Sequence, residues 1–242
     1  AYRDRGANTL GNVAVYMGGL DLTILHWLGL GNVAPIRGVA AAPTPAASHA
    51  KVHRSSEGTD ASGALVEIAG AAAAALIGAG VGCHFIGGAG LLLADVEGLG
   101  DAVLHSCPDP ADVLRHVTDI VQRDNVGLVV ACPEIDADAD AKIGPAGLAR
   151  TLARFDAALG TLLDGLTSDT LLILTSLGGN DATITTRSGA TREFAPMLAY
   201  TPSIPSGVDL GVRTSLADIG ATIGDVFGIQ LEGSSFFSEL VA

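Results

Sequence analysis

Two kinds of hydrophobic pattern alternate along the second half of the chain. Apolar residues recur at helical spacing after the helix start Asp109-Pro110, from Leu148 to Leu166, and from Ser215 to Phe227. Between these helices, short continuous apolar runs over residues 126–131, 170–175 and 194–200 predict buried strands. Strand–helix–strand units of this kind build a mostly parallel sheet with helices on both faces. The predicted fold class is therefore α/β, as a single domain over residues 1–242.

The first half of the chain has a less regular pattern. It predicts helices over Thr9–Met17 and Leu20–Leu28, a strand over Ala47–Arg54, and a turn from Ser55 to Asp60. The stretch from Ile68 to Ala94 contains no charged residue and is long enough to span a bilayer. Seven glycines interrupt it and its alanines are only mildly apolar, so we expect a buried helix, a turn and a buried strand instead.

Composition narrows the class of protein. Hydrophobic residues make up 48% of the chain and charged residues 16%, which excludes a disordered chain. The net charge of −13 argues against a nucleic-acid partner, because such grooves need clustered Lys and Arg. The three cysteines form no CxxC pair, so neither a disulfide framework nor a thiolate zinc site is indicated. We expect a cytoplasmic protein with no nucleic-acid or membrane partner.

In sheets of this kind, ligands bind at the carboxyl ends of the strands. Three loops lie at such ends: residues 55–63, 133–144 and 176–191. They contain most of the residues that could carry chemistry.

Segments in these loops, and others along the chain, resemble phosphopentomutase, a family of the alkaline phosphatase superfamily. Gly6-Ala-Asn-Thr-Leu-Gly11 and Leu28-Gly-Leu-Gly-Asn32 are similar to the family's GxDTxGH and LGLGN elements. Ser56-Glu-Gly-Thr-Asp60 through Val66-Glu-Ile-Ala-Gly70 resembles its nucleophile loop. The segments that resemble its LLLITADHGND, HTREY and FADIGAT elements are Leu171 to Ser176 with Gly179-Asn-Asp181, Thr191-Arg-Glu-Phe194, and Leu216-Ala-Asp-Ile-Gly-Ala-Thr222. The resemblance implies an alkaline-phosphatase-like core.

The same resemblance implies that most of the family's phosphoryl-transfer machinery is replaced. The family uses two metal ions and a Thr nucleophile, whose position falls at Ala61. The positions of its metal ligands fall at Leu177, Gly178, Ala190 and Ala141, none of which offers a lone pair to a metal. Of the family's VDFD loop only the Asp survives, as Asp136. The cap domain that the family inserts after the nucleophile loop is missing, since Gly70 runs directly into Ala71. We expect no metal and no other cofactor.

The residues that remain have two interpretations each. Asp136 is a candidate general base or a ligand of a weak cation site, or else part of a solvated acidic loop. Asp60 and Ser62 are candidate catalytic residues beside the lost nucleophile, or else helix caps. The third set is a candidate substrate-binding group formed by Arg192, Asn180 and Asp181. The alternative is a structural network in which Arg192 pairs with Glu193.

His49 and His53 would share a face in a strand and would be i, i+4 on a helix. Either geometry permits metal binding or acid–base work, but surface histidines are common.

Two functions are consistent with these residues. The first is a repurposed, metal-independent enzyme that acts on a small molecule in the former phosphoryl-transfer cleft, such as an intermediate of specialised metabolism. The alternative is a non-catalytic protein that serves as a binding or scaffolding partner; a residual mutase or phosphatase is improbable. The uncovered apolar stretch from Ile68 to Ala94 also favours a homodimer.

Overall fold

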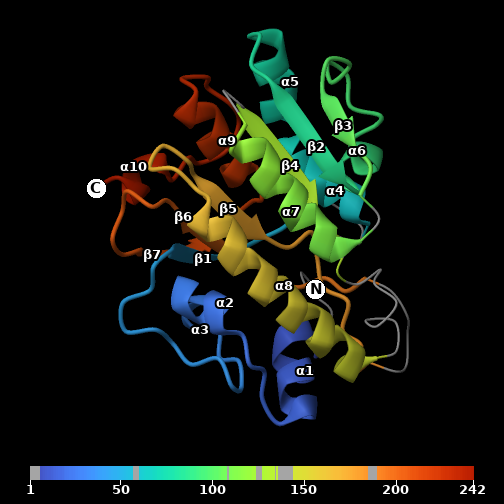
Figure 1. The fold of residues 1–242 in the computed structure, drawn as a ribbon, viewed down its shortest axis with the longest axis vertical. Coiled ribbons are helices and arrows are strands. Elements are labelled where there is room, and N and C mark those ends of the chain that lie inside the picture. The colour runs from blue at the N-terminus through green and yellow to red at the C-terminus, as the bar shows by residue number, and fades with distance from the viewer. Residues whose placement is uncertain are drawn as a thin grey trace.

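The computed structural model describes residues 6–56, 60–107, 109–123, 127–133, 135, 144–184 and 190–242 (Figure 1). Its helices are α1 (Thr9–Met17), α2 (Thr23–Leu28), α3 (Leu30–Val33), α4 (Ala61–Leu65), α5 (Ala71–Gly78), α6 (Ala89–Leu92), α7 (Pro110–Val121), α8 (Pro145–Asp164), α9 (Ala217–Val226) and α10 (Phe237–Leu240), with a π-helical turn η1 (Val66–Gly70) between α4 and α5. The strands are β1 (Ser48–Val52), β2 (Cys83–Gly87), β3 (Val103–His105), β4 (Leu128–Cys132), β5 (Leu172–Thr175), β6 (Ala195–Tyr200) and β7 (Asp209–Arg213).

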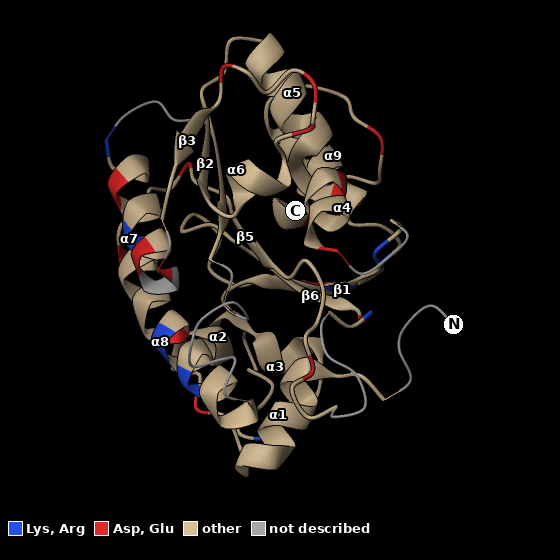
Figure 2. Cartoon of the chain, turned by 90° about the vertical axis from the view of Figure 1, so that its right-hand side faces the viewer, with Lys and Arg blue, Asp and Glu red and all other residues tan. Residues whose placement is uncertain are grey.

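The strands lie between two layers of helices, as the hydrophobic pattern predicts (Figure 2). Successive side chains of a strand point to opposite faces, and β4 shows the result. Val129 and Ala131 pack against the core that contains α1, α2, α7 and α8. Leu128 and Val130 pack against the second core, which contains α4, α5 and α9. The predicted α/β class with helices on both faces is confirmed.

The sheet is formed in two parts. A three-stranded part has the order β3-β2-β4 and is parallel throughout. A four-stranded part has the order β5-β6-β1-β7, in which β6 runs antiparallel to both β5 and β1 while β7 runs parallel to β1. Three of these five pairings are therefore parallel. β4 and β5 were expected to be buried, but both are half-buried, because each lies at the edge of its part of the sheet.

The apolar stretch after residue 60 folds as a helix, a turn and a strand, as expected. α4, η1 and α5 follow one another without an insertion, and a turn then leads to β2. Leu76 is fully buried, so it belongs to the core and not to a surface that a second subunit could cover. Within the described residues, one window, Ala61–Gly78, is apolar and long enough to cross a membrane, and 44% of it is buried in the fold. The absence of a membrane partner stays a prediction.

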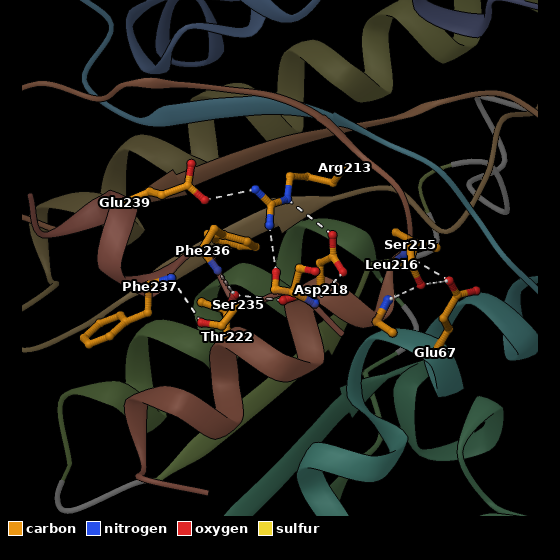
Figure 3. Close-up of polar contacts among 12 residues, drawn as sticks. Glu67, Arg213, Ser215, Leu216, Asp218, Thr222, Ser235, Phe236, Phe237 and Glu239 are labelled. Carbon is orange, nitrogen blue, oxygen red and sulfur yellow. Dashed lines mark hydrogen bonds and ion pairs between the residues drawn. The ribbon is translucent and has the colours of Figure 1, made fainter. Parts of the chain in front are cut away.

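An ion-pair network centred on Arg213 fixes the C-terminal part of the chain to the end of β7 (Figure 3). The guanidinium of Arg213 lies 3.3 Å from Asp218 Oδ2 and 3.0 Å from Glu239 Oε1. Asp218 is buried and also accepts a hydrogen bond from the amide of Ser234. The segment similar to the FADIGAT element is therefore structural: it anchors the chain that follows α9.

Candidate functional site

Three segments meet where β1 and β5 end. Residues 53–56 follow β1, residues 176–181 follow β5, and residues 190–194 precede β6. Because β6 runs antiparallel to both strands, its amino end lies beside their carboxyl ends, with Val52 opposite Ala195 and Thr175 opposite Met197. A bridge between Gly179 and Thr191 joins the last two segments.

Arg54 connects the three segments from a buried position. Its side chain donates from Nε to Ser56 Oγ at 2.7 Å and from Nη1 to the carbonyl of Leu177 at 3.2 Å. It also donates from Nη2 to the carbonyl of Asp60. Only 4% of the residue is exposed. These contacts fix a positive charge between the loop that resembles the nucleophile loop and the loop that follows β5.

Arg192 adds a second guanidinium, as its Nη2 donates to the carbonyl of Arg54 at 3.1 Å. The ring of His53 packs edge-on against Phe194, 5.8 Å between centroids. Burial and then the charge of Arg192 lower the pKa of His53, while the carboxylate of Glu67 opposes them. His49 lies four residues before His53, within β1, and is buried. Its interpretation as a surface histidine is therefore wrong.

The structure brings together two of the predicted catalytic residues. Ser62 Oγ donates to Asp60 Oδ2 at 2.7 Å, and the same oxygen accepts the amide of Gly63 at 2.9 Å. The hydrogen bond from Ser62, followed by that from Gly63, lowers the pKa of Asp60. Asp60 therefore caps α4 and also holds the hydroxyl of Ser62. The cap residue, two positions earlier in the sequence, is thus the hydrogen-bond partner of Ser62.

Glu67, in the π-helical turn, joins the site to the start of α9 (Figure 3). Its carboxylate accepts the amides of Ser55 and Ser56 at 3.0 and 2.9 Å, and the hydroxyl of Ser215 and amide of Leu216 at 2.8 and 2.9 Å. Burial raises the pKa of this carboxyl, but the four donors together outweigh burial and lower it. π-helical turns often occur at functional sites, and here one orients an acid that organises the site.

Asp181, predicted to bind substrate, contacts protein groups with both oxygens. Oδ2 accepts the amide of Asn8 at 3.0 Å and the side-chain amide of Asn12 at 2.7 Å, while Oδ1 accepts the hydroxyl of Thr183 at 2.6 Å. Burial raises its pKa, but these donors outweigh that effect and lower it. Asn180 lies beside it in the same loop. The contacts of Asp181 are structural, and its role in substrate binding stays a prediction.

Both carboxylate oxygens of Glu193 accept hydrogen bonds from threonine residues, and its network with Arg192 stays a prediction. Its Oε2 accepts the amide of Thr9 at 2.8 Å and its Oε1 accepts the hydroxyls of Thr9 and Thr191. Glu193 and Asp181 thus both attach the start of α1 to the site, whereas Arg192 contacts the end of β1.

Asp136, the first-choice catalytic residue, lies outside the described residues, as does Ala141. Its role as general base or cation ligand therefore stays a prediction.

The described residues do not fit the two metal ions that the resemblance implies. Leu177, Gly178 and Ala190 offer no donor side chain, and a Cβ at Gly178 would lie 3.9 Å from Nη1 of Arg54. No three His, Cys, Asp or Glu side chains among the described residues are placed to share a metal ion. A guanidinium lies against the ligand positions instead.

Sequence reasoning missed Arg54 and Glu67. Arg54 ends the predicted strand over Ala47–Arg54, so the rule that ligands bind at strand ends could have selected it. Glu67 lies in a segment similar to the family's nucleophile loop, but its contacts with Ser215 and Leu216 connect residues far apart in the sequence.

Comparison with known proteins agrees with the resemblance. A family model described as the metalloenzyme superfamily matches residues 110–231. The chain is similar to phosphopentomutase from Levilactobacillus brevis, with 39% identity over 132 residues, 53% of this chain and 33% of that one. It is also similar to phosphopentomutase from Herpetosiphon aurantiacus, with 36% identity over 144 residues, 58% of this chain and 37% of that one. These matches span about a third of the length of the curated relatives.

Solved structures support the fold. A protein in the alkaline phosphatase superfamily from Vibrio parahaemolyticus aligns over 93% of this chain and 65% of its own, with a TM-score of 0.59 and 16% identity. The lipoteichoic acid synthase LtaP from Listeria monocytogenes aligns over 88% of this chain and 71% of its own, with a TM-score of 0.54 and 12% identity. At these identities the likeness establishes the fold alone.

Proposed function

The chain belongs to the metalloenzyme superfamily, and from this premise we propose that it is a metal-independent enzyme that acts on a small molecule at the superfamily's former phosphoryl-transfer site. The observation that carries the proposal is the 2.7 Å hydrogen bond from Ser62 to Asp60, beside the buried guanidinium of Arg54. A hydroxyl held by a carboxylate, with a fixed positive charge nearby, is an arrangement suited to transfer reactions. Ser62 is the proposed reacting group.

The proposal gives the other residues definite roles. Asp60 orients the hydroxyl of Ser62, and its lowered pKa keeps it ionised at neutral pH, so it accepts rather than donates the hydrogen bond. Arg192 and Asn180 bind the substrate, and Asp136 is the acid–base residue. Since Gly70 continues directly into Ala71 without a cap, the substrate can be bulkier than a pentose phosphate, such as an intermediate of specialised metabolism in the cytoplasm.

The first experiment measures metal content and mutase activity. We expect no stoichiometric Mn, Mg or Zn by elemental analysis, and no conversion of ribose-1-phosphate to ribose-5-phosphate with added Mn²⁺ and an activating bisphosphate. Loss of a single transition-state donor typically costs ~10²–10³ in rate, and here several groups are replaced. Two metal ions per chain, or mutase turnover that Asp136→Ala abolishes, would contradict the proposal.

The second experiment seeks the positive activity. Hydrolysis of p-nitrophenyl phosphate and p-nitrophenyl acetate is measured in EDTA for wild type, Ser62→Ala, Asp60→Asn and Asp136→Asn. We expect turnover of at least one ester, reduced about 100-fold or more in Ser62→Ala. Ser203→Ala, in an exposed turn, is the matched control and keeps wild-type turnover. If neither ester is turned over, or if the rate requires added Mn²⁺, the proposal is wrong.

A specific observation favours the alternative, a non-catalytic binding partner. Leu91 in α6 is 84% exposed, and Val103 and Leu104 in the edge strand β3 are 47% and 65% exposed. Exposed apolar side chains on a sheet edge are typical of an interaction surface. The alternative holds if no ester is turned over in EDTA.

A further inference from the structure

Three histidines that the candidate site does not use meet at the edge strand β3. His105 of β3 is paired with Ile86 of β2, and His84 lies two residues before Ile86, so both histidines lie on the face of the sheet that α7 covers. His116 of α7 completes the group, with its ring edge-on to that of His105 at 6.4 Å between centroids. β3 has three residues and lies at the end of its part of the sheet, so side-chain contacts matter for holding it in place.

His84 and His105 share one hydrogen between their rings. Nδ1 of His84 lies 3.0 Å from Nε2 of His105. The centroids are 5.3 Å apart, which exceeds that distance by about the width of one ring, so the two nitrogens face each other. A metal ion between facing nitrogens would need them about 4 Å apart, because each bond is about 2 Å long. A proton fits this space and a metal ion does not.

The surroundings of His105 oppose its protonation in the folded protein. Burial is the first cause that lowers its pKa, and the charges of His84 and then of His116 lower it further. Cys107 lies with its sulfur 4.0 Å from Nδ1 of His116. Burial, followed by the charge of Asp112, raises the pKa of the Cys107 thiol, so this group supplies no negative charge to the histidines.

The charged groups around the histidines are already paired or face solvent. Asp112 and Arg115 of α7 pair with each other at 3.1 Å. Asp109, just before α7, accepts the thiol of Cys107 with its carbonyl. α6 carries no charged residue, and the loop between α6 and β3 carries three exposed acids, Asp95, Glu97 and Asp101. The balance of all these groups leaves the pKa of His105 below its ordinary value.

We propose that the contact between His84 and His105 is a pH-sensitive switch that holds β3 on β2 at neutral pH and releases it in acid. One extra proton leaves the hydrogen bond intact, because a charged ring still donates from the shared position. A second extra proton puts hydrogens on both facing nitrogens and breaks the bond.

The sign of the effect follows from proton binding. A released His105 takes up a proton near its ordinary pKa of 6.5, whereas the folded group resists protonation. The released form binds more protons, so it gains stability as the pH falls below about 6.5, until the folded group is protonated as well. Release would also remove the exposed apolar side chains of Val103 and Leu104 from this edge. The inference does not depend on the proposed catalysis.

Hydrogen–deuterium exchange of residues 101–107, expressed as protection factors, tests the switch between about pH 7.5 and about pH 5.5. We expect protection to fall about tenfold in the wild type, because one unit below its pKa a released histidine is about ten times more often charged than neutral. His105→Gln keeps a hydrogen-bonding amide opposite His84 but takes up no proton, so its protection should change less than about twofold. His26→Gln, in the last turn of α2, is the matched control and should keep the wild-type fall.

Three results would overturn the inference. The first is equal protection of β3 at both pH values in the wild type, and the second is an equal fall in wild type and His105→Gln. The third is a fall in β1 and β6 as large as that in β3, which would mean that acid unfolds the whole protein. Should His105→Gln not fold, His84→Asn, whose amide lies where Nδ1 lies, decides instead: a reduced fall upholds the switch and an unchanged fall overturns it.

Discussion

Single side chains join the segments of this site, and Glu67 is one of them. It accepts two donors from the end of β1 and two from the start of α9. Arg54 also joins segments of the site, because its guanidinium donates hydrogen bonds to the hydroxyl of Ser56 and to the carbonyl of Leu177. At the scale of residues, the site is organised by hydrogen bonds to charged groups, which are stronger than those between neutral groups.

Glu67→Gln should make the stability of the protein less dependent on pH. The folded pKa of Glu67 is below its ordinary value of 4.5, so its contribution is fully present above that value and is lost as the pH falls through the folded pKa. We expect a loss of roughly 1–2 kcal/mol near neutral pH that shrinks on acidification. Thermal melting from about pH 7 to about pH 3 measures this. Glu97→Gln, on an exposed loop, is the control, and an equal loss at every pH would contradict the prediction.

At the scale of elements, segments that resemble family motifs prove to have structural roles. Gly31, in the Leu28-Gly-Leu-Gly-Asn32 segment, lies so close to the chain opposite that a Cβ would sit 2.0 Å from the carbonyl oxygen of Ala40. Asn32 next to it donates to the carbonyl of Ala42 and accepts its amide. The short helix α3 thereby fixes the crossing that leads into β1.

Gly31→Ala should destabilise the fold by about 3 kcal/mol, because the clash is with backbone that cannot rotate away. Gly78→Ala is the matched control: a Cβ there meets nothing within 4 Å, and alanine is favoured over glycine in a helix by roughly 0.5–1 kcal/mol. Chemical denaturation of both variants measures the difference. Equal stability of the two would show that the close approach at Gly31 is not constrained.

The network of Arg213 and Asp218 in Figure 3 should matter in the same way for the C-terminal elements. Arg213→Ala leaves Asp218, with its side chain 3% exposed, as a buried charge without its cation. Removing one partner of such a pair costs roughly 3–5 kcal/mol. Differential scanning calorimetry should show a large drop in melting temperature. Arg115→Ala, whose ion pair with Asp112 is exposed, should leave the melting temperature unchanged, and a similar small effect at Arg213 would refute the prediction.

At the scale of the whole molecule, the apolar surface has a different position from the one expected. The sequence favoured association through the stretch from Ile68 to Ala94, but Leu76 within it is fully buried, so a charge there would disrupt the core. α5 and α6 carry no charged residue (Figure 2), and the most exposed apolar residue near them is Leu91. With Val103 and Leu104 in β3, it makes this part of the surface our predicted site of self-association.

We predict a homodimer that forms through the β3 edge. Leu104→Asp should convert it to a monomer, because a charge on an apolar contact is costly to bury. Val15→Asp, on the exposed face of α1, is the matched control and should leave the dimer intact. Sedimentation at micromolar concentration measures the state. Since each copy has a net charge of −13, added salt should strengthen association. A wild-type monomer at all salt concentrations would rule the dimer out.

The sequence by itself determined the fold class and most elements. The helix expected over Thr9–Met17 has these bounds in the structure, and those expected from Asp109-Pro110, Leu148 and Ser215 are α7, α8 and α9. These predictions succeed because hydrophobic periodicity is local and records which face of a helix or strand is buried. The resemblance to the family's nucleophile loop directed attention to Asp60 and Ser62; the alternative that Asp60 caps a helix is confirmed, and their catalytic role stays a prediction.

Only the tertiary structure decided the strand pairings and the composition of the site. β7 was not predicted and β6 is antiparallel, because pairing depends on contacts between distant residues such as Val52 and Ala195. That pairing brings Arg192 to Arg54, and the chain beyond β5 brings Leu177 to the same guanidinium. No local sequence pattern indicates which distant residues come into contact in the fold. The burial of Arg54 follows from tertiary contacts alone.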